Sequence, residues 1–107
     1  MEEVLAEWKQ ICPVADAPGT DEVAEFEVEG RMLCVANVGG TLHVLDNWCP
    51  HRQGPLGQGW IEGQNVVCPW HAWAFDCRTG AVTEPERAQV KVFPVQTQNG
   101  TVEVDLS

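Results

Sequence analysis

Two pairs of cysteine and histidine lie in the middle of the chain. One residue separates Cys49 from His51, and two residues separate Cys68 from His71. Thiolate and imidazole are the side chains best suited to soft and borderline metals. A proline directly follows each cysteine, which fixes the local backbone and stiffens the loop between the two side chains. The four residues therefore predict a metal centre held by two loops.

The segment between the two pairs is rich in glycine. It contains Gly54, Gly57, Gly59 and Gly63. Because glycine has no Cβ, backbone N–H groups at these positions can come close to a bound, electron-rich centre. Inorganic sulfide is an acceptor of that kind.

Three kinds of metal centre compete for this ligand set. A structural zinc site uses two Cys and two His, but it usually staples a small fold that lacks its own core. A blue-copper site needs one Cys, two His and a weak axial ligand. A Rieske [2Fe–2S] cluster has two His in place of two Cys on one iron. Mixed Cys–His loops favour this third centre, because each loop can offer one sulfur and one nitrogen, and zinc stays open as the alternative.

The central segment resembles the Rieske [2Fe–2S] signature, in which Cys-x-His is followed by Cys-x-x-His. The positions that match are Cys49-Pro50-His51, Leu56, Gly59, Gly63, Cys68-Pro69-Trp70-His71, Phe75-Asp76 and Thr79-Gly80, with Phe93-Pro94-Val95 further along. The resemblance implies that Cys49 and Cys68 bind the inner iron and that His51 and His71 bind the outer, redox-active iron. Ala72 departs from the glycine that is common after the second histidine.

The residues around the two pairs distinguish among classes of Rieske protein. Respiratory and photosynthetic members carry a membrane anchor and a disulfide between the two loops. Here the corresponding positions are occupied by residues 52–54 and Trp70, none of which is cysteine. The chain also has no tyrosine, and its only serine is Ser107. Hydroxyl donors to cluster sulfurs raise the reduction potential, so we expect a low-potential ferredoxin.

The elements that must position these loops are predicted to be strands. Alternating segments at residues 8–12, 22–29, 32–38, 41–46, 90–95 and 101–106 indicate short strands. Gly39-Gly40 and Asn99-Gly100 are turn signals, the second joining the last two strands. With 107 residues, the sequence predicts one all-β domain over residues 1–107, an antiparallel sandwich or barrel. The cluster-binding subdomain is expected at about residues 47–80, formed by two loops.

The chain is strongly acidic, with 16 Asp and Glu against 6 Lys and Arg and a net charge of −10. This charge excludes a nucleic-acid backbone or an anionic membrane as the natural partner and favours a basic protein surface. On the strand at residues 22–29, Glu25, Glu27 and Glu29 are expected to face solvent together.

The remaining cysteines and histidine are expected to have no metal-binding role. Cys12, Cys34 and Cys77 are interpreted as packed thiols and His43 as a strand residue. Residues 1–7 lack the pattern of a signal peptide and no apolar run is long enough to span a bilayer, so a soluble, cytoplasmic protein is expected.

A filled four-ligand iron centre leaves no open site for bond chemistry, so the expected function is one-electron transfer with no catalytic residues. The chain is thereby expected to resemble ferredoxin components that pass electrons from a flavin-dependent reductase to a terminal oxygenase. The alternatives are the small subunit of an assimilatory NAD(P)H nitrite reductase and a zinc-stapled interaction module. Exposed apolar residues around the outer iron are expected to contact the partner; the candidates are Trp48, Pro50, Trp60 and Trp70. Trp73 is expected to pack in the core.

Overall fold

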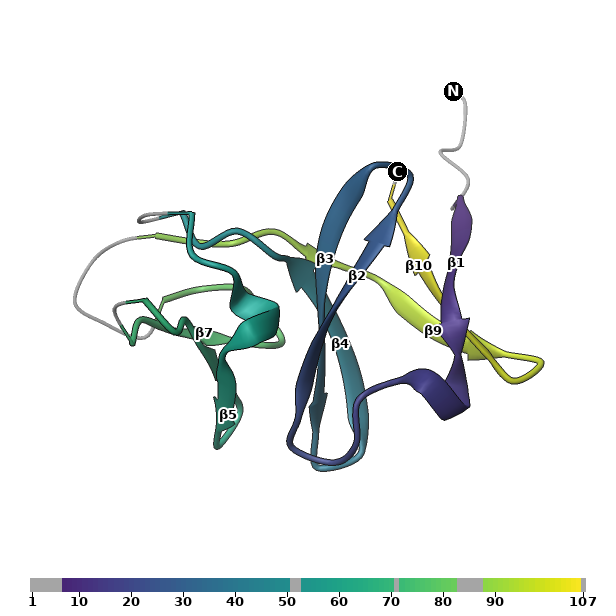
Figure 1. Cartoon of the computed structure of the whole chain (residues 1–107), viewed down its shortest axis with the longest axis horizontal. Coiled ribbons are helices and arrows are strands. Elements are labelled where there is room, and N and C mark those ends of the chain that lie inside the picture. The colour runs from purple at the N-terminus through teal and green to yellow at the C-terminus, as the bar shows by residue number, and fades with distance from the viewer. Residues whose placement is uncertain (1–6, 51–52, 71, 83–87, 107) are drawn as a thin grey trace, which may run out of the picture.

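The computed structural model describes residues 7–50, 53–70, 72–82 and 88–106. These residues form strands and two short 3₁₀ helices, arranged as three antiparallel sheets (Figure 1). The elements are β1 (Trp8–Pro13), η1 (Val14–Asp16), β2 (Val23–Val28), β3 (Arg31–Val38), β4 (Thr41–Asp46), η2 (Leu56–Gln58), β5 (Trp60–Glu62), β6 (Asn65–Val67), β7 (Ala74–Asp76), β8 (Val92–Phe93), β9 (Val95–Gln98) and β10 (Thr101–Asp105). The predicted all-β fold is confirmed. No helix among the described residues is long and apolar enough to cross a membrane.

Two sheets form the base of the molecule. The larger has the order β2-β3-β4-β8 and the smaller the order β1-β10-β9. Tight turns with left-handed backbones connect β2 to β3, β3 to β4 and β9 to β10; the last two are the predicted turns at Gly39-Gly40 and Asn99-Gly100. Buried side chains from both sheets pack against each other; they include Leu33, Val35, Val44, Phe93 and Val104. This packing is the core of a sandwich, in which alternate residues of each strand point inward.

The predicted strand at residues 90–95 is wrong as a single element. Pro94 divides it into β8 and β9, which belong to different sheets. Val92 and Phe93 pair with β4, whereas residues from Val95 onward pair with β10. Proline has no N–H to contribute to a ladder, so the pairing can change partner at this residue. The last hairpin is therefore shorter than predicted.

The third sheet, β5-β6-β7, forms a small subdomain beside the base (Figure 1). Its residues Val66 and Phe75 are fully buried, and they share an apolar cluster with Cys34 and Leu45 of the base. Leu56, in η2, is buried in the same cluster. The subdomain that the sequence predicted as two loops thus also contains a sheet of its own, anchored to the base through a common core.

Candidate metal centre

The first cysteine loop, residues 49–54, lies between the end of β4 and η2. The N–H of Cys49 donates to the carbonyl of Gly54 at 2.8 Å, and the N–H of Gln53 donates to the carbonyl of Cys49 at 2.7 Å. Directly outside this ring, Trp48 and Pro55 form an antiparallel bridge. The backbone therefore closes on itself around the loop and fixes the position of Cys49.

The second cysteine loop, residues 68–73, joins β6 to β7 and has the same backbone pattern. The N–H of Cys68 donates to the carbonyl of Trp73 at 2.8 Å, and the N–H of Ala72 donates to the carbonyl of Cys68 at 2.9 Å. Val67 and Ala74, directly outside, are a registered strand pair. Each cysteine is thus the first residue of an equivalent six-residue loop.

The histidines expected as ligands occupy different positions of the two loops. His51 is the third residue of the first loop and His71 the fourth residue of the second. Both lie outside the described residues. In the described part of the chain, no group of three or more His, Cys, Asp or Glu side chains could hold a metal ion. Of the four expected ligands, the structure describes the two cysteines, Cys49 and Cys68.

The two loops approach each other at Gly54. A Cβ atom built on Gly54 would lie 2.6 Å from the Sγ of Cys68 and 3.2 Å from Cγ of Trp70, both in the second loop. Only glycine fits such a contact. Cys49 and Cys68 are each 1% exposed, so both sulfurs are removed from water. Two shielded cysteines on adjoining loops are a donor set that fits an iron–sulfur cluster better than an exposed ion site.

Exposed apolar side chains lie on and directly beside the two loops. Trp48 is 42% exposed and Trp70 is 56% exposed, and Pro50 is exposed as well. Trp60 is exposed on β5. Trp73, in contrast, packs against the apolar cluster, with its ring centroid 6.4 Å from that of Phe75. The expected separation of the tryptophans into surface and core residues is confirmed.

The other three cysteines are packed thiols, as expected. Cys34 and Cys77 are fully buried and Cys12 nearly so. Burial raises the pKa of Cys34, with further contributions from Cys77 and Glu25, and it raises the pKa of Cys77 to about 11. The neutral thiol is the stable form of each, so neither is a reactive thiolate at neutral pH.

His43 is a half-buried residue of β4 that pairs with Ala36. Burial lowers its pKa; the carboxylate of Asp76 opposes this effect and the guanidinium of Arg78 adds to it. The imidazole is therefore mostly neutral at pH 7 and sits in a strand, as the sequence predicted.

One part of the site was not anticipated from the sequence. Asn47, two residues before Cys49, is completely buried, and its side-chain N–H₂ donates to the carboxylate of Glu25 at 2.6 Å. Glu25 is therefore half-buried and hydrogen-bonded, and the prediction that it faces solvent with Glu27 and Glu29 was wrong for this residue. Strand alternation gives no signal for a contact between residues 22 positions apart.

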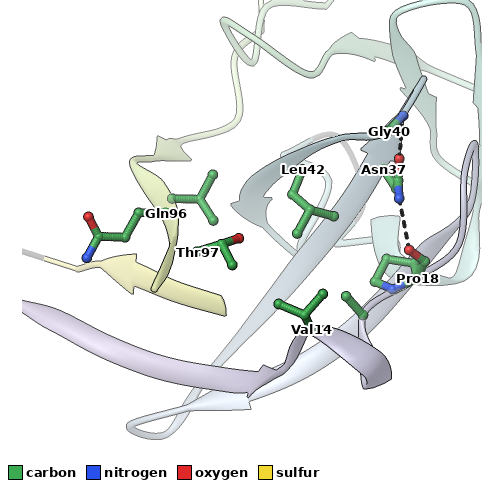
Figure 2. A pocket seen from close by; sticks show the side chains of 9 residues that line it. Val14, Pro18, Asn37, Gly40, Leu42, Gln96 and Thr97 are labelled. Carbon is green, nitrogen blue, oxygen red and sulfur yellow. Dashed lines mark hydrogen bonds between the residues drawn. The ribbon is translucent and has the colours of Figure 1, made fainter. Parts of the chain in front are cut away.

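A surface cavity of about 340 Å³ lies elsewhere, between η1, the β3–β4 turn and β9 (Figure 2). Figure 2 shows Val14 and Leu42 at its wall, and the side chain of Asn37 bridging Gly40 and Pro18. None of its lining residues belongs to the cysteine loops, and none carries a charge. The cavity has no part in the metal centre.

Comparison with known sequences identifies relatives with matching length. The family described as "Rieske [2Fe-2S] domain" matches residues 7–94. The ferredoxin component of a naphthalene 1,2-dioxygenase system of Pseudomonas putida is 33% identical over 105 residues, covering 97% of this chain and 100% of the relative. An anthranilate 1,2-dioxygenase ferredoxin subunit of Burkholderia cepacia is 33% identical over 110 residues, covering 98% and 97%.

Solved structures of ferredoxins have the same fold. The ferredoxin of Sphingomonas yanoikuyae B1 superimposes with a TM-score of 0.82 at 33% identity, covering 92% of this chain and 97% of that one. The ferredoxin in a complex of reduced oxygenase and oxidised ferredoxin of carbazole 1,9a-dioxygenase gives a TM-score of 0.79 at 27% identity, covering 89% and 98%.

Proposed function

The chain belongs to the Rieske [2Fe-2S] domain family, and from this premise we propose that it is the ferredoxin component of a multicomponent oxygenase system. It carries one Rieske-type [2Fe–2S] cluster and is an electron-transfer component, not a catalyst on its own. The observation that carries this proposal is the pair of equivalent loops, each beginning with a buried cysteine, that meet at Gly54.

We infer that the cluster is bound by Cys49, His51, Cys68 and His71. Support comes from the burial of both cysteine sulfurs and from the contact between the two loops, which brings Cys68 up to the first loop. The two histidines stand at different positions of the two equivalent loops, third in one and fourth in the other. This arrangement fits a cluster with two inequivalent irons, one bound by sulfur ligands and the other by nitrogen ligands. When bound, such a cluster accepts and donates single electrons. This chain's own residues position it and shield its sulfur ligands from water.

The expected partners are a flavin-dependent reductase and a terminal oxygenase. The relatives described above are dioxygenase ferredoxins, which favours this role over that of a nitrite reductase subunit. A net charge of −10 would attract a basic docking face and orient the encounter. The exposed Trp48, Pro50 and Trp70 then offer an apolar contact directly beside the loops.

We also propose that residues 1–107 form a single Rieske domain, with residues 47–80 as its cluster-binding part. The shared core between the β5-β6-β7 sheet and the base supports this assignment. A cytoplasmic location is consistent with Cys12, Cys34 and Cys77, which are free thiols, because thiols persist in reducing compartments.

The proposal is tested with the purified protein. We expect iron and acid-labile sulfide in equal amounts, a visible spectrum, and an EPR signal after reduction. Stopped-flow mixing of the reduced protein with the terminal oxygenase of an aromatic-ring dioxygenase system should then reoxidise it. A colourless protein that contains zinc and no sulfide would refute the cluster. A coloured protein that no oxygenase reoxidises, but that binds a nitrite reductase large subunit, would refute the proposed partner class alone.

A further inference from the structure

The carboxylate of Glu25, on β2, binds two side chains that lie on either side of the first cysteine loop. Asn47 precedes that loop, and its Nδ2 donates to Oε2 of Glu25 at 2.6 Å. Gln58 follows the loop, in η2, and its Nε2 donates to Oε1 of Glu25 at 3.0 Å. Each carboxylate oxygen therefore accepts one hydrogen bond from a residue that flanks the first cysteine loop, while Glu25 itself belongs to β2 of the base.

Asn47 extends this connection to the backbone of η2. Its Oδ1 accepts a hydrogen bond from the N–H of Gly57 at 2.8 Å, and its carbonyl accepts one from the N–H of Leu56 at 2.7 Å. The N–H of Asn47 donates to the carbonyl of Met32 on β3 at 3.3 Å. A completely buried amide needs such partners, because an unsatisfied one has lost its hydrogen bonds to water without replacing them. Asn47, at the beginning of the first loop, is thus hydrogen-bonded both to η2, at the end of that loop, and to strands β2 and β3 of the base.

Packing around this connection is tight. A Cβ atom on Gly57 would collide with Cγ of Glu25 and would lie 2.9 Å from Oδ1 of Asn47. The turn of η2 therefore rests directly on the Glu25 side chain, and η2 lies against β2. Neither side chain can move far without displacing the backbone that returns from the first loop.

The two cysteine loops differ in how they are supported. The second loop is carried by β6 and β7, which pair over three residues each. In the described part of the chain, no strand pair carries the first loop: its flanking residues form one isolated bridge, between Trp48 and Pro55, and one hydrogen bond, from the N–H of Leu56 to the carbonyl of Asn47. Its attachment to the base therefore depends more on contacts outside a strand ladder: the burial of Cys49 and Leu56, and the hydrogen bonds of Asn47 and Glu25.

We propose that Glu25 is a positioning residue for the cluster, holding the first cysteine loop against the base through Asn47 and Gln58. The inference rests on the proposed ligand set, in which this loop supplies Cys49 and His51. Its consequence is that the Glu25 carboxylate controls how easily the two loops separate, and therefore how fast the cluster is lost, although Glu25 is not itself a ligand.

The test compares Glu25→Gln with Glu27→Gln in the cluster-loaded protein. Both variants remove one negative charge from β2, but Glu27 is exposed. Gln at position 25 offers one oxygen and one N–H₂ group, so one of the two donors from Asn47 and Gln58 would face another donor. We expect Glu25→Gln to lose its visible spectrum to an iron chelator roughly tenfold faster than the wild type. Glu27→Gln should stay within about twofold.

Hydrogen-exchange mass spectrometry supplies the local readout. In Glu25→Gln, the peptide that contains Leu56 and Gly57 should exchange faster, and the β6–β7 peptide should be unchanged. The EPR g-values should shift in Glu25→Gln only. If Glu25→Gln does not fold, Gln58→Ala, which removes one of the two hydrogen bonds at an exposed residue, should speed cluster loss roughly threefold.

The proposal is overturned if Glu25→Gln and Glu27→Gln lose the cluster at the same rate, or if faster exchange is spread equally over β6 and β7. It is overturned as well if Glu25→Gln fails to fold and Gln58→Ala behaves like the wild type. A wild-type protein without any cluster would instead refute the proposed function.

Discussion

Gln53 and Ala72 adopt the same left-handed backbone at the same position of the two cysteine loops. The φ angle is 61° at Gln53 and 57° at Ala72, and each N–H donates to the carbonyl of the cysteine four residues earlier. A residue with a Cβ atom is strained in this region by roughly 1 kcal/mol. The closed form of each loop thus requires this conformation, and neither loop uses glycine to provide it.

Replacing Ala72 by glycine should stabilise the protein, by less than about 1 kcal/mol, because the relief of strain at positive φ exceeds the entropy that glycine adds to the unfolded chain. Urea unfolding of the cluster-loaded protein measures the change. The control is Ala74→Gly in β7, where the backbone is extended and glycine should destabilise by about 0.5–1 kcal/mol. Equal destabilisation by both substitutions would show that φ at Ala72 is not the source of strain.

Replacing Gly54 by alanine should prevent cluster assembly. The added methyl group would lie 2.6 Å from the Cys68 sulfur, so the two loops must separate. Iron and sulfide per protein and the visible spectrum measure the loss. Gly63→Ala is the matched control: φ is +62° there, but no atom lies within 4 Å of the added carbon. A Gly54→Ala protein with a full complement of iron would contradict the proposed placement of the cluster between the loops.

Replacing His71 by alanine should abolish the characteristic spectrum and destabilise both loops, because one iron loses a ligand. The same result is expected for His51→Ala. The control is His43→Ala in β4, which also removes one imidazole but should leave the spectrum intact. Normal absorption and EPR spectra in the His71 variant would exclude it as a ligand.

The midpoint potential should lie toward the low end of the Rieske range, at about −150 mV rather than +300 mV. The chain has no tyrosine and only one serine, Ser107, so the Ser and Tyr hydroxyl donors that raise the potential in other members have no counterpart near the two loops in the sequence. A spectroscopic redox titration gives the value. A midpoint well above zero would mean that other donors reach the cluster sulfurs.

Electron transfer to the oxygenase should slow as salt is added. The screening length falls from about 10 Å at 0.1 M salt to about 3 Å at 1 M, which removes long-range attraction between the acidic chain and a basic face. Stopped-flow rates over a salt series provide the measurement. A rate independent of salt would indicate that apolar contact around Trp48 and Trp70 governs docking without steering by charge.

Much of the base could be predicted from local patterns. Gly39-Gly40 and Asn99-Gly100 are turns in the structure with positive φ at all four residues, because these residue types tolerate that conformation and strongly favour hairpins. Cys49 and Cys68 stood out as candidate ligands for a similar reason, since their chemistry and spacing leave few alternative metal centres, and both are buried on adjoining loops. Prediction from the sequence was sufficient where the types of one or two neighbouring residues determine the local structure.

What could not be predicted depends on contacts between distant segments. Glu25 has the same local pattern as Glu27, and only the return of the chain to η2 separates their environments. The equivalence of the two cysteine loops is also invisible in the sequence, because their histidines occupy different positions and only the backbone hydrogen bonds match. Pro94 signalled an interruption, but not which sheet each side of it would join.

The change of sheet at Pro94 bears on how the base comes apart. β8 is bonded to β4, which leads directly into the first cysteine loop, while β9 is bonded to β10, and the carbonyl of Pro94 accepts a hydrogen bond from the N–H of Asp105. Pro94 thus connects the two sheets along the chain, in addition to the core that they share, and separation of the terminal hairpin would disturb β8 and the strand β4 with which it pairs. Cluster release and melting of the C-terminal hairpin are therefore expected to occur as one cooperative event.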